Sequence, residues 1–109
     1  MSLNKEVFII KIIYVSGRYR AKTWLGKVWN IYRARRAAQQ LWDMGWCVIC
    51  PHMNTALFKE DGIPYIAGDR AIIKRCCDAI FMLKGYKSSE GAMIELATAK
   101  IKGITILYE

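Results

Sequence analysis

Two carboxylates in this 109-residue sequence stand where they could take part in catalysis. Residues 88–95 read SSEGAMIE, so hydroxyls and a glycine lead into a helix pattern with Glu95 one turn inside it. A glutamate there is either a surface residue favoured by the helix dipole or a nucleophile. Asp69, within AGDRAII, is by default a solvent-facing helix residue. It could take part in catalysis only if the start of its helix points toward a crevice that also holds Glu95.

A second set of residues has the chemistry of an anion site. The stretch SGR at 16–18 offers a hydroxyl, a compact backbone and a guanidinium, and SSEG at 88–91 offers hydroxyls and free N–H groups at a helix start. Such groups form phosphate cradles. Two tight turns with capping serines explain the same residues equally well, so both interpretations stay open.

Four continuous apolar runs must supply the strands that position these residues. Continuous rather than alternating apolar character is typical of strands buried on both faces of a parallel sheet. The runs are Val7 to Val15, Trp46 to Cys50, Ala79 to Leu83 and Ile104 to Tyr108. Lys11 is the exception within the first run, and it marks either a sheet edge or the true start of the strand.

Helical patterns lie between these runs. They cover Asn30, as the N-cap, to about Met44, then Tyr65 to Cys76, and Ser89 to Lys102. The order β-α-β-α-β-α-β predicts an α/β fold, three-layer and flavodoxin- or Rossmann-like. We expect a four- to five-stranded parallel sheet with helices on both faces, in a single domain over residues 1–109.

The loops after parallel strands open onto one edge of the sheet, where ligands bind in such folds. His52, the only histidine, is a structural residue by default, and its loop position favours a functional one. The side chains expected around this crevice are Tyr14, Ser16, Arg18, Tyr19, Arg20, His52, Asn54, Ser89 and Glu95.

The charge and apolar content of the chain limit the kinds of binding partner that we expect. A net charge of +8 attracts nucleic acid, anionic lipid or phosphorylated small molecules. Glu6 and Lys11 interrupt the apolar N-terminal run, and no apolar span reaches the length of a membrane helix, so we expect a cytoplasmic protein without a membrane partner.

Four cysteines are expected as buried structural thiols. Cys47 and Cys50, three apart in a strand, point to opposite faces, and the adjacent Cys76 and Cys77 are poorly placed to pair. Neither pair favours a zinc or redox site, and we expect no metal and no cofactor.

Ordered pieces along nearly the whole chain match one superfamily: YVSGRYR (14–20), NIYRARRA (30–37), CPHMNTALF (50–58), AGD (67–69), CDAI (77–80) and SEGAMIE (89–95). With these pieces the sequence resembles the nucleoside 2-deoxyribosyltransferase-like superfamily. It looks closest to small, often phage-encoded members described only as a domain of unknown function. The resemblance implies one such domain over residues 1–109 that cleaves N-glycosidic bonds, as a hydrolase or a deoxyribosyltransferase.

The resemblance also implies roles for individual residues. Ser89, Gly91 and Glu95 match a motif of serine or aspartate, glycine and glutamate whose glutamate is the nucleophile. Tyr14 would orient that carboxylate. Asp69 would help to bind the sugar or leaving base, and it is the first choice for the acid that assists the departing base, with His52 the second.

One departure from the superfamily pattern points to the substrate. The base-exchanging transferases have aspartate where this chain has Ser89, whereas the 5′-monophosphate hydrolases of the superfamily have serine and use it on phosphate. Ser89 with Arg18 and Arg20 therefore favours a 5′-phosphorylated nucleotide. Residues 16–20 (Ser16, Gly17, Arg18, Tyr19, Arg20) with His52, Asn54, Ser89 and Gly91 are the expected substrate-binding set.

Other classes of function remain open from the sequence. The same scaffold serves as a non-catalytic nucleotide-binding module. A basic nucleic-acid-binding protein using Arg33, Arg35 and Arg36 ranks last, because no groove-reading motif is visible. Superfamily enzymes borrow residues from neighbouring subunits, so the resemblance implies a homo-oligomer, a dimer or larger. Trp24 and Trp29, in the loop after Arg20, would stack on a base or fill a dimer interface.

Overall fold

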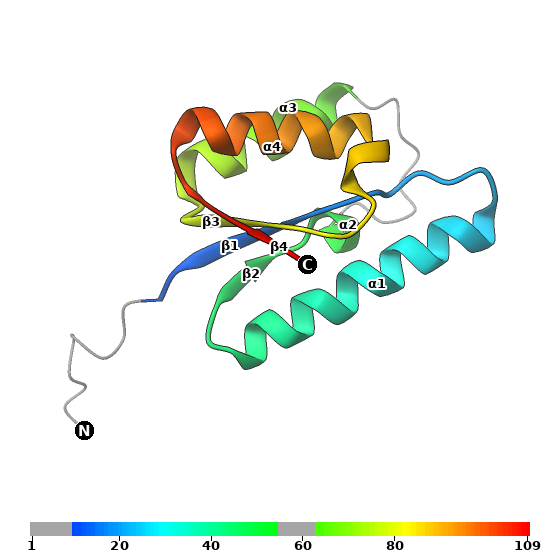
Figure 1. Cartoon of the computed structure of the whole chain (residues 1–109), viewed down its shortest axis with the longest axis horizontal. Coiled ribbons are helices and arrows are strands. Elements are labelled where there is room, and N and C mark those ends of the chain that lie inside the picture. The colour runs from blue at the N-terminus through cyan, green and yellow to red at the C-terminus, as the bar shows by residue number, and fades with distance from the viewer. Residues whose placement is uncertain (1–9, 55–62) are drawn as a thin grey trace.

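The computed structural model describes residues 10–54 and 63–109, with backbone only at positions 53, 54, 63 and 64. Four parallel strands form one sheet in the order β2-β1-β3-β4, which confirms the predicted α/β class (Figure 1). The elements are β1 (Ile12–Ser16), α1 (Trp24–Asp43), β2 (Cys47–Ile49), α2 (Pro51–Asn54), α3 (Ile63–Cys76), β3 (Ala79–Met82), a 3₁₀ turn η2 (Tyr86–Ser88), α4 (Glu90–Lys102) and β4 (Thr105–Tyr108).

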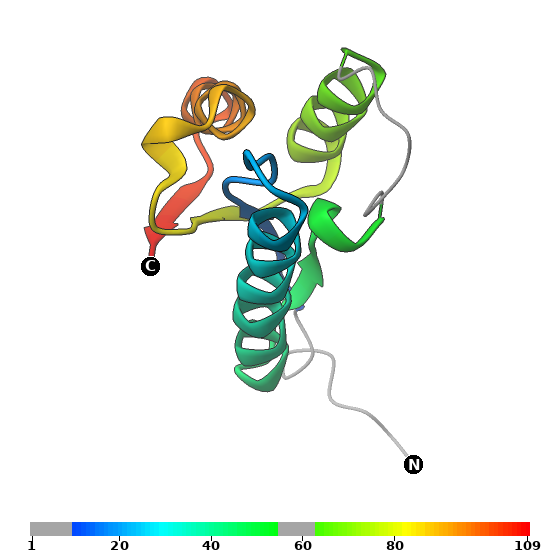
Figure 2. The ribbon, with the colours of Figure 1, turned by 90° about the vertical axis from the view of Figure 1, so that its right-hand side faces the viewer.

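The sheet is the middle of three layers. Helix α1 covers one face and α3 and α4 cover the other, as Figure 2 shows. Successive side chains of β1 alternate between the two faces. Ile13 and Val15 pack in the cluster under α1, whereas Tyr14 packs in the cluster under α3 and α4. This alternation also brings Ser16 to the α4 side, which the site requires.

The start of the first helix differs most from the prediction. Helix α1 begins at Trp24 rather than after Asn30, because the Thr23 side chain accepts a hydrogen bond from the Gly26 N–H and caps the helix there. Trp24 and Trp29 therefore belong to α1 and not to a loop. Strand β1 begins at Ile12, after Lys11, and residues 7–9 of the predicted run lie outside the described residues.

The cysteines follow the prediction in part. Cys50 and Cys77 are buried and Cys47 is half-buried, but Cys76 is exposed because it ends α3 on its solvent side. Burial, more than the neighbouring Cys76, raises the pKa of the Cys77 thiol to about 12. Over the described part of the chain, no helix is both long and apolar enough to cross a bilayer.

A close approach between two loops fixes the rim of the site. A Cβ added at Gly17 would lie 2.6 Å from Leu83 Cδ1 and 2.8 Å from Leu83 Cβ, and Leu83 is buried. We therefore expect Gly17→Ala to lower the free energy of unfolding by about 1–3 kcal/mol, measured by urea denaturation. Gly68→Ala on α3, where nothing lies within 4 Å, is the control and should stabilise by roughly 0.5–1 kcal/mol. Equal stability of the two variants would contradict this view of the rim.

Candidate active site

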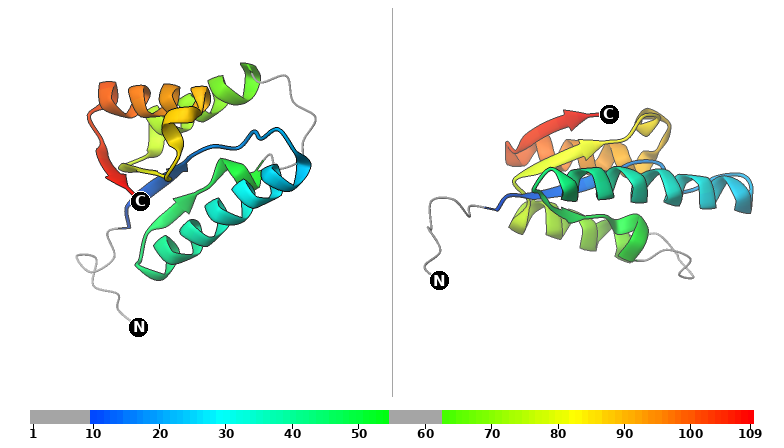
Figure 3. Two further views of the ribbon diagram at one scale, coloured as in Figure 1. Left: turned by 45° about the vertical axis from the view of Figure 1, so that its right-hand side comes forward. Right: turned by 90° about the horizontal axis from the view of Figure 1, so that it is seen from below.

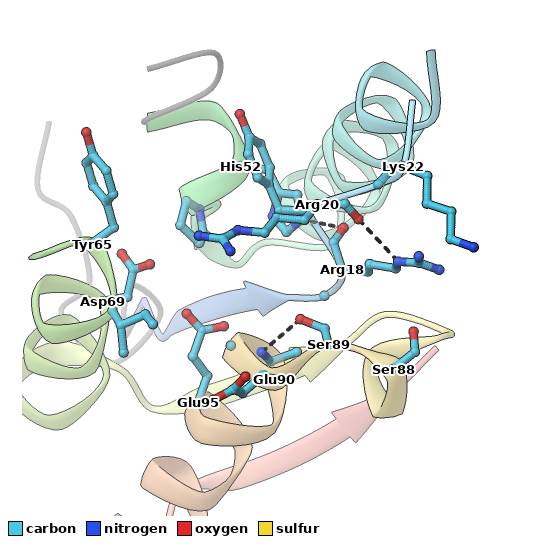
Figure 4. Close-up of a pocket in the computed structure, with 17 residues that line it drawn as sticks. Arg18, Arg20, Lys22, His52, Tyr65, Asp69, Ser88, Ser89, Glu90 and Glu95 are labelled. Atoms are coloured by element: carbon cyan, nitrogen blue, oxygen red, sulfur yellow. Dashed lines mark hydrogen bonds between the residues drawn. The ribbon is translucent and has the colours of Figure 1, made fainter. Parts of the chain in front are cut away.

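A pocket of about 620 Å³ opens at the carboxyl edge of the sheet, where the sequence predicts a crevice (Figure 4). Its size is that of a small-molecule site. It is lined by the loop after β1 (residues 17–22), the start of α2 (51 and 52), one face of α3 (65, 66 and 69), and η2 with the start of α4 (88–92 and 95).

Glu95 forms part of the pocket wall and is only 8% exposed. It occupies the buried face of α4 together with Ala92 and Leu96, where a packed helix ordinarily carries apolar side chains. The Tyr14 hydroxyl donates to Glu95 Oε2 at 2.5 Å, and the Ser16 hydroxyl donates to Oε1 at 2.7 Å. Both carboxylate oxygens are thus held by β1, so the orientation of the group is fixed.

Electrostatics leave this carboxyl poised between its two protonation states. Burial raises the pKa of Glu95 from 4.5 to about 7, although the hydrogen bonds from Tyr14 and Ser16 oppose the shift. Burial, with the nearby Glu95 and Asp69, raises the pKa of Tyr14 well above its usual range. Tyr14 therefore remains a hydroxyl donor at any physiological pH.

Asp69 supplies a second carboxyl to the same pocket from α3. Burial raises its pKa, and hydrogen bonding with Tyr14 and Glu95 opposes that shift. Figure 4 shows the Asp69 and Glu95 carboxyls directed into the same part of the pocket, with Tyr65 one helical turn before Asp69. Asp69 also contributes to the raised pKa of Glu95, because two carboxyls that share one site disfavour double ionisation.

The loop after β1 has no secondary structure, but hydrogen bonds to its carbonyl oxygens hold it in place. His52 Nε2 lies 3.0 Å from the Arg18 carbonyl oxygen, and because a carbonyl only accepts, Nε2 carries the proton. Asn30, buried within α1, donates from Nδ2 to the Tyr19 carbonyl at 3.2 Å. Asn30 thus ties α1 to the loop instead of capping the helix. Arg18 Nε donates to the Arg20 carbonyl at 3.2 Å.

His52 itself is neutral. It is 4% exposed, and burial lowers its pKa. Its ring meets Tyr19 edge-on with centroids 5.6 Å apart, and its Nδ1 has no hydrogen-bond partner among the described residues. A neutral imidazole that is hydrogen-bonded to the loop after β1 fits a positioning role for His52 better than the role of a proton donor.

Cationic and hydroxyl groups face each other across the mouth of the pocket. Figure 4 shows Arg18, Arg20 and Lys22 on one side, with Ser88 and Ser89 on the other. Ser89 caps α4 by accepting from the Ala92 N–H at 3.1 Å. The Ser89 hydroxyl accepts this bond and can still donate its proton to a ligand, and the first-turn N–H groups of a helix are a common site for anions.

Most of the predicted site residues meet at this pocket. Tyr14 and Ser16 lie beneath it and contact Glu95, so the Ser16 hydroxyl is committed to that carboxylate and does not join the anion cradle. The Asn54 side chain lies outside the described residues. The predicted residues that line the pocket are Gly17, Arg18, Tyr19, Arg20, His52, Asp69, Ser89, Gly91 and Glu95.

Sequence reasoning missed several lining residues. Lys22 extends the cationic side of the mouth, and its place just after Arg20 was a usable signal. Tyr65 and Ile66 form an apolar wall beside Asp69, and their helical spacing from Asp69 places them on one face. Pro51 and Glu90 also line the pocket, with no sequence signal that separates them from ordinary loop and helix-start residues.

Comparison with known protein families gives one match. A family model described as Domain of unknown function (DUF4406) matches residues 11–108. That span contains every element of the fold and every residue that lines the pocket. No curated protein matches the chain. Within residues 10–54 and 63–109, no group of three or more His, Cys, Asp and Glu side chains is arranged to hold a metal ion.

Proposed function

The chain belongs to the family described as Domain of unknown function (DUF4406), and we propose that its pocket cleaves the N-glycosidic bond of a nucleotide in the cytoplasm. The observation that carries the proposal is the Glu95 carboxylate, buried at the pocket with both oxygens held by Tyr14 and Ser16. The sequence resemblance to nucleoside 2-deoxyribosyltransferase-like proteins supports the same chemistry and implies a homo-oligomer.

In the proposed reaction, ionised Glu95 attacks the anomeric carbon of the sugar. The N-glycosidic bond breaks through an oxocarbenium-like state, and its electron pair leaves with the base. A negative charge beneath that carbon stabilises the transition state and then forms a glycosyl ester. Water, or a second base, attacks the ester and restores the carboxylate with overall retention of configuration.

The departing base needs a proton, and Asp69 is the group proposed to give it. Burial raises its pKa, and its carboxyl opens into the same part of the pocket as Glu95. Tyr65 and Ile66, next to Asp69 on α3, would supply the apolar surface against which a planar base packs.

The cationic side of the mouth is proposed to bind a 5′-phosphate. Arg18→Ala should raise KM for a nucleoside 5′-monophosphate by roughly tenfold, because a charge-assisted hydrogen bond is lost. Its effect on the matching unphosphorylated nucleoside should be small. Steady-state kinetics on both substrates measures this, with Lys87→Ala, an exposed cation outside the pocket, as control. Equal changes for both substrates would assign Arg18 a structural role only.

The direct test of the function is release of free base. The purified protein is incubated with ribo- and deoxyribonucleoside 5′-monophosphates of each base, with and without an acceptor base, and the products are separated by chromatography. Base release without acceptor indicates a hydrolase, and exchange only with acceptor indicates a transferase. Absence of both for every substrate, with folded protein, would rule the proposal out.

A non-catalytic nucleotide-binding module is the second candidate, and one observation favours it. Both oxygens of Glu95 already accept hydrogen bonds from the protein, as the oxygens of a structural carboxylate do. Calorimetry followed by chromatography of the bound nucleotide separates the two functions, because a module binds a nucleotide tightly and leaves it intact.

A further inference from the structure

The solvent face of α1 carries an apolar surface in its first half. Leu25 is 74% exposed, Trp24 66%, Trp29 59%, Tyr32 50% and Val28 37%. The rings of Trp29 and Tyr32 stack on each other, with centroids 5.7 Å apart and an angle of 25° between their planes. These first turns of α1 extend beyond the ends of the strands (Figures 1 and 3).

Basic side chains continue the same face of α1 toward the C-terminus of the helix. Arg35 and Arg36 follow Tyr32 by about one helical turn, and both are exposed. Between Gly17 and Trp42 the chain has no acidic residue and seven basic ones: Arg18, Arg20, Lys22, Lys27, Arg33, Arg35 and Arg36. Arg33 pairs with Glu109 at 3.2 Å, whereas Arg35 and Arg36 pair with no acid among the described residues. We call Trp24, Leu25, Val28, Trp29, Tyr32, Arg35 and Arg36 the α1 face.

The charge of this surface decides among its possible occupants. A second copy would cover the apolar half but would leave Arg35 and Arg36 without an opposite charge, because no residue of the α1 face is acidic and the next acid along the helix, Asp43, already accepts a hydrogen bond from Gln39. A polyanion with flat apolar groups uses both halves at once. A planar base can stack on the Trp29–Tyr32 pair and add a third ring to it. Lipid chains have no flat ring that could stack in this way.

We propose that the α1 face binds single-stranded nucleic acid, with bases stacking on Trp29 and Tyr32 and phosphates contacting Arg35 and Arg36. Such sites combine aromatic platforms with a cationic track and tolerate any sequence. A single strand fits better than a duplex, because the bases of a duplex are already stacked and their faces are closed to side chains. The proposal goes beyond the nucleotide pocket and does not depend on catalysis there.

The test is fluorescence anisotropy of a labelled twelve-nucleotide oligothymidylate, titrated with the full chain at low salt. We expect binding, and a loss of roughly tenfold or more in affinity for Trp29→Ala. For the double variant Arg35→Ala/Arg36→Ala, the slope of log affinity against log salt should become shallower by about 1.4, the share of two phosphates in a single strand.

Matched controls separate this site from the general effect of a +8 charge. Lys100→Ala/Lys102→Ala removes the same charge from exposed positions on α4, and Ile101→Ala truncates an apolar side chain that is 86% exposed. Both should bind as the unaltered chain does, and so should Glu95→Gln. Circular dichroism checks that each variant is folded.

Three results would overturn the proposal. The first is no binding of the oligonucleotide at low salt, and the second is equal weakening by the α4 controls. The third is a Trp29-dependent dimer in light scattering, or Trp29-dependent binding to phosphatidylserine vesicles, without any effect of Trp29→Ala on the oligonucleotide. That result would assign the α1 face to a second copy or to a lipid surface.

Discussion

Replacing Glu95 by glutamine should lower the rate of base release by roughly three orders of magnitude or more, the scale found when a nucleophile is removed. Glutamine has nearly the same size and still accepts from Tyr14, so the pocket keeps its shape. What it lacks is the negative charge beneath the anomeric carbon and the ability to form a glycosyl ester. The loss should therefore appear in kcat, with little change in KM.

The measurement is the initial rate of base release from the best nucleotide of the substrate panel. Asp43→Asn makes the same chemical change at an exposed position far from the pocket and should leave the rate unchanged. If the Glu95→Gln enzyme keeps roughly a tenth or more of the activity, Glu95 is not the nucleophile.

A chemical rescue distinguishes a nucleophile from a residue that only shapes the pocket. In Glu95→Ala the missing carboxylate leaves space beneath the sugar, and added azide can attack the anomeric carbon from the same side. The expected product is a glycosyl azide with inverted configuration, because only one displacement has taken place. No rescue, together with undiminished nucleotide binding, would favour the binding module over the enzyme.

The site shows what sequence can anticipate. Glu95 was predictable because the SSEG turn before it marks a helix start, and a carboxylate one turn later falls on a face that the helix must bury. The meeting of the loops at one edge follows from the parallel order of the strands. The hydrogen bonds of Glu95 do not follow from the local sequence, because Tyr14 and Ser16 are about eighty residues away. Their contact with Glu95 depends on the register of β1 against β3 and on the depth at which α4 packs.

The start of α1 shows why sequence periodicity fails at an unusual surface. An amphipathic pattern is visible from Ile31 onward, because there the buried face is apolar and the outer face is charged. Before that point the outer face is apolar, with Trp24, Leu25 and Trp29 exposed, and the buried residue is the polar Asn30, so the usual contrast between the faces is reversed. Thr23 marks the true start, but the apolar residues after it favoured a loop or interface over a helix.

The second large effect expected at Glu95 concerns stability and its dependence on pH. A carboxyl whose pKa is raised on folding binds its proton more tightly in the folded state than in the unfolded state. Its stabilising effect is complete below the ordinary pKa of 4.5 and is lost as the pH rises through about 7. Above that pH, the chain folds with a buried negative charge at a free-energy cost of about 3 kcal/mol.

Glutamine at position 95 does not titrate, so Glu95→Gln should be more stable than the unaltered chain at pH 8 by an amount approaching about 3 kcal/mol, or on the order of 10 °C in melting temperature. The difference should shrink between pH 7 and 4.5 and vanish below that range. Scanning calorimetry of both proteins from pH 4 to 9 measures it.

Opposite signs for the two effects of one substitution are the signature of a functional carboxylate. A residue kept for packing loses stability when it is replaced, whereas a residue kept for chemistry costs stability and supplies rate. If Glu95→Gln proves less stable than the unaltered chain at every pH, the hydrogen bonds from Tyr14 and Ser16 outweigh the burial of the charge. Glu95 would then be a structural anchor between β1 and α4.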